Sequence, residues 1–573
     1  MAETIISPGV FQRENDISFI QPAPVEAGAA IIGPTVKGPV EIPTIVTSFN
    51  DFSRKFGVTF ESGSNKHEFL TSMAVKSYFE QGGNTCLVSR VVNGTFAAAS
   101  STAIEDAGAS GTSPFTLETL GKGAIYNNQS GSVYGEENLD GSLISGSEDN
   151  LRFEISNVDS AKGTFTVSIR RGDDNTKSKV VLETFSNVSL DPNSTNYIER
   201  VIGNQTKAIS GDSDQIEVTG EYINNSNFVR VSAVSSPTLN YLANDGVTVR
   251  DAAFVDSLPT AQQGAFHAAT GNVAGGALLY DKIAANNTQG LAASDYDNVI
   301  TLLSNDDDYQ FNVISAPGLI DELHGTQVDN LISLVESRGD SIAVVDLKVH
   351  GSSVQSLATQ AGTLNSSYAA TYWPWLQTSS ATGKNVWVPA SVVIPGIYAF
   401  TDGAAAPWFA PAGLVRGGIV GVIQAERKLS RTDRDTLYNG KVNPIATFPG
   451  TGLALFGQKT LQTKASALDR VNVRRLLIDL KKFIGDQAKN LVFEQNTITT
   501  RNKFLSTVNP YLESVTQRQG LYAYRVVMDD TNNTADVIDR NQLVGQIFIQ
   551  PAKTAEFIVL DFVVEPTGAS FAG

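Results

Sequence analysis

The texture of the sequence changes near Gly94 and changes back near Asp295, and this break constrains the fold more than any other feature. Before and after it, segments with helical and strand periodicity alternate, which is typical of an α/β domain. Between them, short runs of alternating polar and apolar residues are separated by segments rich in Gly, Ser, Asn and Thr. Such a stretch is typical of a β-rich insertion carried on an α/β scaffold.

We therefore predict a multidomain protein of the α+β and α/β classes, with an α/β core, a β-rich insertion and an αβ C-terminal domain. At about 150 residues per domain, 573 residues suffice for three or four domains. The first twenty residues form no self-sufficient unit, so we interpret them as an arm. The predicted segments are an N-terminal arm (1–24), the first part of the core (25–93), the insertion (94–245), the second part of the core (246–440) and a C-terminal domain that ends in a strand arm (441–573).

Periodicity predicts the main elements of the core and the insertion. Residues Lys66–Gln81 have apolar side chains at helical spacing and end at Gly82-Gly83, a signal for a helix C-terminus. Phe311–Ala316 is a predicted buried strand that ends at Pro317-Gly318. Other predicted strands are Ala29–Ile32, Ile42–Ser48, Thr85–Val92, Arg152–Val158, Thr164–Arg170, Asn227–Val234 and Ser341–Leu347, and other predicted helices are Gln327–Ser337 and Ser353–Leu364.

The strongest helical pattern, Asp469–Leu491, lies in the predicted C-terminal domain. At about 100° per residue its apolar side chains fall within one arc and its cationic side chains within another. The cations are Arg470, Arg474, Arg475, Lys481, Lys482 and Lys489. Their arc is either an ordinary solvated face or a contact surface, and the clustering of cations in an acidic chain favours the contact surface. A helix near Arg501–Gln517 and strands at Gly520–Met528, Leu543–Gln550 and Glu556–Val564 complete the predicted domain.

Charge is distributed unevenly along the chain. The sequence has 42 Lys and Arg and 59 Asp and Glu, a net charge of −17, which argues against direct binding of nucleic acid. Residues 94–230 contain 19 acidic and 10 basic residues, whereas residues 441–573 contain 12 acidic and 15 basic residues. This separation predicts that the insertion faces solvent and that the C-terminal domain faces an acidic partner.

No targeting or membrane signal is evident. No apolar leader follows Met1, and the most apolar stretch, Asn385–Phe400, is interrupted by Pro389 and Pro395. The single cysteine, Cys86, cannot form an intrachain disulfide, which fits folding in a reducing cytosol. We expect neither conventional secretion nor membrane insertion.

No motif gives positive support for catalysis, a cofactor or a metal. The segment GLALFGQKT at 452–460 resembles a phosphate-binding loop, but Gln458 separates the second Gly from the Lys, so we favour a glycine turn. The acidic stretches 306–308 and 529–536 are interpreted as turns, since neither has the pattern of a calcium loop. Cys86 is interpreted as a core residue. The histidines are scattered without metal-ligand spacing: His67, His267, His324 and His350.

Several long segments, in order, resemble the contractile tail sheath proteins of myovirus-type, T4-like bacteriophages. They cover most of the chain and match least from about Gly94 to Val180. The segments are ISPGVFQREND (6–16), AAIIGPTVKGPVEIPTIVTSFNDFSRKFG (29–57), ETFSNVSLDPNSTNYIERVI (183–202), APWFAPAGLVRG (406–417), NPIATFPGTGLALFGQKTL (443–461), VNVRRLLIDLKKFI (471–484) and YRVVMDDTNNTADVIDRNQLVGQIFIQPAKTAEFIVLDF (524–562).

The resemblance implies a structural subunit and no enzyme. In this family, hexameric rings stack helically around a tail tube, and contraction drives the tube through the host envelope for genome delivery. Arms of neighbouring subunits add strands to a sheet in the C-terminal domain, so that the lattice stays connected while domains rotate. Implied partners are further copies of the chain, the tail tube protein, and baseplate and tail terminator proteins, in a virion whose tail is assembled in the host cytoplasm; no cofactor is implied.

Carried over to this sequence, the resemblance implies arms at Ile5–Phe19 and Phe557–Val564 and a C-terminal domain that lines the tube through the cationic helix. The residues implied for the arm strands are Ile5, Ile6, Val10, Phe11, Ile17, Phe19, Phe557, Val559, Leu560, Phe562 and Val564. An arm that cannot bury its own apolar residues suits β-augmentation. Two alternatives stay open: the sheath of a phage-derived injection device of the tailocin type, and a carbohydrate-binding or enzymatic surface protein built on the insertion.

Overall fold

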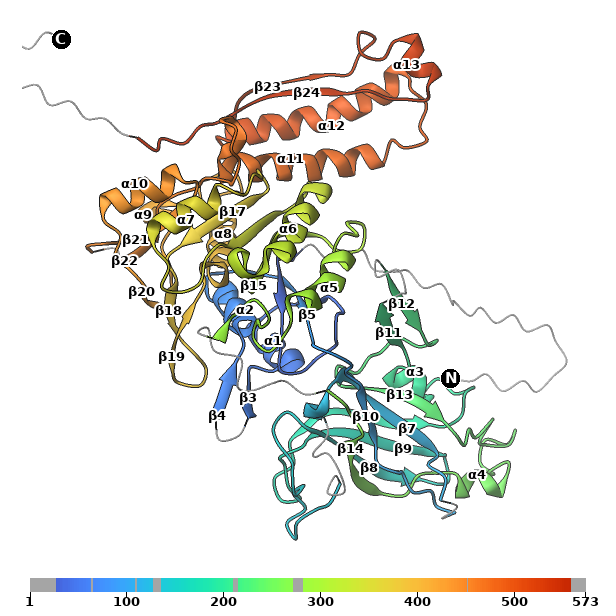
Figure 1. Ribbon diagram of the computed structural model, residues 1–573. Coiled ribbons are helices and arrows are strands. Elements are labelled where there is room, and N and C mark those ends of the chain that lie inside the picture. Colours follow the sequence, from blue (N-terminus) through green and yellow to red (C-terminus); the bar gives the residue numbers. More distant parts are fainter. Residues whose placement is uncertain are drawn as a thin grey trace, which may run out of the picture.

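A computed structural model describes residues 27–62, 65–108, 111–126, 135–209, 215–271, 282–450 and 452–557 (Figure 1). Ten of the eleven residues implied for the arm strands lie outside these ranges, and Phe557 is the exception. The described part is mixed α and β, with two large sheets and a third, helical region stacked along the molecule. Within it, no helix is long and apolar enough to cross a membrane.

An eight-stranded sheet forms the central domain, in the order β2-β5-β1-β15-β16-β17-β21-β22. Adjacent strands from β5 to β21 run parallel, and an antiparallel strand closes each edge. The strands are β1 Ala27–Gly33, β2 Thr44–Val46, β5 Cys86–Arg90, β15 Phe311–Ile320, β16 Ile342–Asp346, β17 Ala369–Trp373, β21 Asn443–Phe448 and β22 Gly452–Leu455. Their central members are buried along their length, since helices cover the parallel sheet.

Helices pack on this sheet in groups that bring distant segments together. The α2 helix (Leu70–Glu80) contacts α8 (Ile394–Ala404), and α5 (Asp297–Leu302) contacts α6 (Asp321–Arg338). The other helices of the central domain are α1 Phe49–Phe56, α7 Val354–Ala361, α9 Gly413–Arg416 and α10 Arg431–Asn439. Two smaller sheets lie beside the main one: β3 (Thr59–Ser62) with β4 (Asn65–Glu68), and β19 (Asn385–Val388), β18 (Leu376–Ser379) and β20 (Val422–Ala425). Cys86 is buried within the apolar core.

Several element boundaries differ from the sequence prediction; for example, the helix predicted from Gln327 begins at Asp321. The helix predicted from Lys66 begins only at Leu70, because residues 65–68 pair as β4 with β3. Strand β15 continues through Pro317 and Gly318 to Ile320. The lost ladder bonds are replaced there by side chains: Thr288 Oγ1 donates to the Gly318 carbonyl (2.7 Å) and Gln289 Nε2 to that of Pro317 (2.9 Å).

The insertion is a seven-stranded sheet in the order β10-β9-β8-β14-β6-β7-β13, with antiparallel neighbours. The strands are β6 Ala98–Ser101, β7 Phe115–Lys122, β8 Leu151–Asp159, β9 Thr164–Arg171, β10 Val181–Ser189, β13 Val229–Val234 and β14 Gln262–His267. A hairpin, β11 (Thr206–Ile209) and β12 (Ile216–Thr219), and the short helices α3 (Ile198–Ile202) and α4 (Ala252–Asp256) complete it.

The sheets correct two predicted domain boundaries. Strand β14 is central to the insertion sheet, so the insertion extends past residue 245 to His267. Strands β21 and β22 complete the central sheet, so the central domain extends past residue 440 to Leu455. Both errors have one cause: composition changes mark where texture changes, whereas strand pairing joins segments far apart in sequence.

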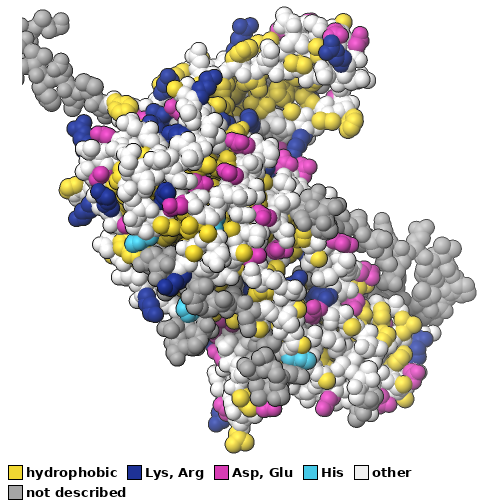
Figure 2. Space-filling view, in the orientation of Figure 1, with side chains coloured by type: hydrophobic (Ala, Val, Ile, Leu, Met, Phe, Trp, Pro, Cys, Tyr) yellow, Lys and Arg dark blue, Asp and Glu magenta, His cyan; other side chains and the backbone are white. Residues whose placement is uncertain are grey.

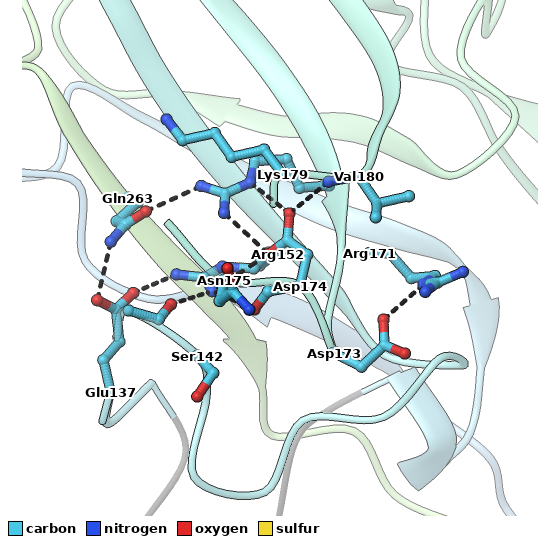
Figure 3. A network of polar contacts seen from close by, with 12 residues as sticks. Glu137, Ser142, Arg152, Arg171, Asp173, Asp174, Asn175, Lys179, Val180 and Gln263 are labelled. Atoms are coloured by element: carbon cyan, nitrogen blue, oxygen red, sulfur yellow. Dashed lines mark hydrogen bonds and ion pairs between the residues drawn. The ribbon is translucent and has the colours of Figure 1, made fainter. Parts of the chain in front are cut away.

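A buried ionic network ties the loops of the insertion to its sheet (Figure 3). The side chains of Arg152, Arg170 and Asp174 are fully buried. Arg170 donates two bonds of 2.8 Å to Asp174, one from Nε and one from Nη2, and its Nη1 donates to Glu154 (2.8 Å) and to Gln263 of β14 (2.9 Å). Arg152 bonds Asp174 and Glu137. The network thus fixes the returning strand β14 to the strands that precede it.

The C-terminal domain consists of two long helices and a hairpin (Figure 1). Helix α11 (Val471–Lys489) packs on α12 (Ile498–Gln517), and β23 (Leu521–Val527) pairs antiparallel with β24 (Gln546–Pro551), with α13 (Ala535–Asp539) between them. A separate apolar core, which includes Trp408, Leu476, Phe504 and Leu512, holds these elements together.

Candidate assembly surfaces

The cationic arc of α11 faces the central domain. Arg474 and Arg475 are only 4% exposed. The Arg474 guanidinium lies 3.9 Å from the centre of the Tyr368 ring and bonds the Ser367 hydroxyl. Arg475 donates to Asp402 (2.6 Å) and lies over the ring of Tyr398.

The lysines extend this contact along the helix. Lys481 Nζ donates to the Tyr368 hydroxyl (3.0 Å), and Lys482 Nζ donates to the Phe311 carbonyl (3.3 Å). Lys489 pairs with Asp307 at 3.4 Å, where both side chains are exposed. Burial lowers the pKa of the Arg474 guanidinium, opposed by the neighbouring Tyr368 and Glu336.

The prediction that this arc presents its cations outward is therefore wrong for the buried Arg474 and Arg475, whereas Lys481 and Lys489 are exposed. Helical periodicity identified two faces correctly but could not show that both are covered. The apolar face packs on α12, and the cationic face packs on the central domain. The missing signal was the set of covering groups, Tyr368, Tyr398 and Asp402, which come from separate segments and share no spacing with α11.

The sixth cation, Arg470, belongs to a polar clamp around Glu556. Arg470 Nε donates to Glu556 Oε1 (2.8 Å), Gln458 Nε2 donates to the same oxygen (3.0 Å), and the Tyr438 hydroxyl donates to Oε2 (2.8 Å). Burial alone would raise the pKa of Glu556, but these three donors lower it overall. The clamp fixes the chain to the central domain one residue before Phe557, which is 79% exposed and is the last described residue.

The hairpin of β23 and β24 is a candidate strand acceptor. In the described part of the chain each of the two strands pairs only with the other, so both outer edges present backbone N–H and C=O groups. Tyr522 and Phe548 on these strands are 65% and 56% exposed. A two-stranded ribbon of this kind is marginal alone and is a template for a further strand.

The structure gives the motifs set aside above an ordinary place in the fold. The segment that resembles a phosphate-binding loop forms β22 and the turn after it, where Gln458 is buried. Among the described residues, no group of three or more His, Cys, Asp or Glu side chains could hold a metal ion.

The comparisons with known proteins bear on the central and C-terminal domains. Residues 285–461 match the family model of the phage tail sheath protein central domain, and residues 463–565 match that of the phage tail sheath C-terminal domain. The border between the two matches follows β22, as the sheet topology requires.

Individual relatives agree with these matches. The tail sheath protein of Vibrio phage KVP40 is 47% identical over 189 residues, and that of Enterobacteria phage T4 is 43% identical over 187 residues. Each alignment covers 33% of this chain and 28% of the relative, so the match spans under a third of these relatives' length. The crystal structure of the sheath tail protein of Listeria innocua is 10% identical, covers 92% of this chain and 96% of that one, and superposes with a TM-score of 0.51, a likeness of fold alone. Residues 285–461 and 463–565, just under half of the chain, therefore carry the central and C-terminal domains that are found in phage tail sheath proteins.

Proposed function

We propose that this protein is the structural subunit of a contractile phage tail sheath. It polymerises as stacked hexameric rings around a tail tube and contracts to drive the tube through the host envelope. The observation that carries the proposal is that the chain matches two sheath domains and that the second of them contains a hairpin, β23 and β24, whose outer edges pair with no other described strand.

Strand exchange between neighbouring copies is the proposed link. The β23–β24 hairpin accepts strands from the arms of other copies, with backbone hydrogen bonds supplying the connection and alternate side chains supplying the register. The Glu556 clamp gives the C-terminal arm a fixed point of departure from its own subunit. The arms run over Ile5–Phe19 and Phe557–Val564.

The insertion faces outward and the C-terminal domain faces the tube, in keeping with the acidic insertion and the slightly basic C-terminal segment. The tail tube, baseplate and tail terminator proteins are the other partners, and the assembled protein is part of the virion. Since Arg474 and Arg475 serve the contact with the central domain, a tube-facing surface draws on the exposed cations of this domain, such as Lys489.

Electron microscopy of the purified full-length chain at rising concentration tests the proposal. Hollow tubes of uniform width are expected from the unmodified protein. Removal of Met1–Ser18 should leave a folded monomer that forms no tubes, with circular dichroism and thermal unfolding unchanged. A control with the same 18 residues in scrambled order keeps the length and composition and should also fail. Failure of the unmodified chain to assemble, or tubes from the truncated chain, would overturn the proposal.

A further inference from the structure

An apolar patch with a basic border lies on the central domain beside the Glu556 clamp. Five large apolar side chains are exposed there, on α9, on β20 and just before it, and next to β22. Their exposed fractions are 49% for Leu414, 84% for Val415, 60% for Val420, 52% for Ile423 and 46% for Phe456.

Backbone contacts place the segment between α9 and β20 along β22. The N–H of Leu455 donates to the Gly417 carbonyl (2.7 Å), and the N–H of Ile419 donates to the Leu453 carbonyl (3.2 Å). The chain that carries the patch therefore covers the outer edge of β22, the last strand of the central sheet. Apolar side chains at this density on a folded, edge-capped surface indicate a contact with another protein surface.

The border of the patch is cationic. Arg434 of α10 lies over the rings of Phe448 and Phe456, at 5.4 Å and 5.6 Å from their centres, and Arg427 and Lys428 are exposed nearby in sequence. Residues 413–441 contain six basic and three acidic residues, a net charge of +3, so the rest of the chain carries −17 − 3 = −20. Figure 2 shows Lys and Arg side chains gathered on the side of the molecule where Figure 1 places α9 and α10.

We propose that this patch, Leu414, Val415, Val420, Ile423 and Phe456 with its basic border, is a docking surface for a second copy of this chain. Two observations select that occupant. A second copy is acidic outside this region and so complements the border. The last described residues also lie here, because Tyr438 of α10 and Gln458, two residues after Phe456, both hold Glu556, and the proposed C-terminal arm begins at the next residue. The copy that receives this arm is therefore adjacent to the patch.

The contact is head-to-tail, since the patch meets a different surface of its partner. Such contacts build open helical assemblies when the rotation does not close a ring. The inference rests on the proposed sheath function and assigns it a contact surface that is distinct from the arm strands.

A double substitution, Val415→Asp with Val420→Asp, tests the patch by placing two anions in it. We expect the protein concentration for half-maximal tube formation, measured by sedimentation, to rise at least tenfold while thermal unfolding is unchanged. The matched control is Val247→Asp, which alters a side chain of the insertion that is 77% exposed and lies five residues before α4 in the sequence. It should assemble within twofold of the unmodified chain.

A cysteine probe gives a second, direct readout. Cys86 is the only cysteine and is buried, so Val415→Cys can be labelled selectively with an environment-sensitive dye. The dye should become shielded from a soluble quencher when tubes form. The docking proposal would be overturned if the double variant formed tubes at the same protein concentration as the unmodified chain, or if the dye stayed fully accessible to the quencher in tubes. Failure of the unmodified chain to form tubes would instead overturn the sheath proposal.

Discussion

Asp346 provides a test of how the central domain holds together, because it places a carboxyl group in the interior of the sheet. It ends β16 and is 5% exposed. Its two oxygens accept hydrogen bonds from Ser391, one from the backbone N–H (3.2 Å) and one from the hydroxyl. Burial raises the pKa of Asp346 to about 7, and the two bonds from Ser391 only partly oppose this rise.

The sign of the resulting pH dependence follows from proton binding. Between the ordinary pKa of 3.8 and the folded value of about 7, the folded state keeps the proton that the unfolded state has lost. Stability therefore falls as the pH rises through this window and levels off above it. The slope contributed by this group approaches about 1.4 kcal/mol per pH unit, and the whole window amounts to about 4 kcal/mol.

Asp346→Asn should remove this dependence. The amide oxygen can accept from the Ser391 N–H, and the amide nitrogen can donate to the Ser391 hydroxyl, as the neutral acid does. The variant should match the natural protein near pH 4 and exceed its stability by a few kcal/mol at pH 8. The assay is urea unfolding followed by tryptophan fluorescence, since Trp373, Trp375 and Trp387 pack in or against this core.

Asp435→Asn, on the exposed side of α10, is the matched control for the change in net charge. It should leave the pH dependence of the natural protein in place. The free energies of unfolding of the natural protein and of Asp346→Asn are to be compared from pH 4 to pH 8. If their difference stays constant over this range, the carboxyl is not held neutral in the folded state and the reasoning is wrong.

Three further predictions concern the other polar contacts. Asp174→Ala leaves the buried guanidinium groups of Arg152 and Arg170 without this carboxylate and should destabilise the insertion by about 3–5 kcal/mol. The loss should be measured as faster proteolysis within residues 94–267. Arg171→Ala, the control, removes a more exposed ion pair and should change little. Arg475→Met removes the bond to Asp402 and should lower the free energy of local opening at α11 by about 2 kcal/mol. Amide exchange of the α11 residues measures this, and Lys489→Met is the near-neutral control. Glu556→Gln weakens its bond from Arg470 and should raise the concentration needed for tube formation several-fold without shifting thermal unfolding of the monomer, in contrast to the exposed substitution Glu494→Gln.

Periodicity alone predicted the elements whose burial is one-sided or complete along their length. The strands at Thr164–Arg170 and Ser341–Leu347 coincide closely with β9 and β16, and the two long helices of the C-terminal domain are within a few residues of α11 and α12. Local sequence sufficed there because a strand or helix of that length repeats its pattern several times.

Pairing between segments far apart in the sequence could not be predicted from sequence patterns. Nothing in Gln262–His267 indicates that it crosses the middle of the insertion sheet, since its neighbours β8 and β6 lie over 100 residues earlier. The Glu556 clamp joins α10, the turn after β22 and the last described residues, and no spacing connects them. The apolar patch could not be predicted for a different reason. An isolated exposed apolar side chain is ordinary, and only the fold shows which of them lie near one another.

The double coverage of α11 limits where motion can occur when a sheath contracts. The helix contributes Leu476 and Leu480 to the core of the C-terminal domain and also Val471 and Ile478 to the central core. A rotation of the C-terminal domain at this helix would open one apolar core and break the contacts of Arg474 and Arg475 together. Contacts between copies of the chain cost less free energy to exchange than these buried cores. We therefore expect the movement during contraction to occur at the contacts between copies. Amide exchange in residues 471–489 should then be equally slow in the free subunit, in extended tubes and in contracted tubes; faster exchange in either form of tube would place a hinge at α11 instead.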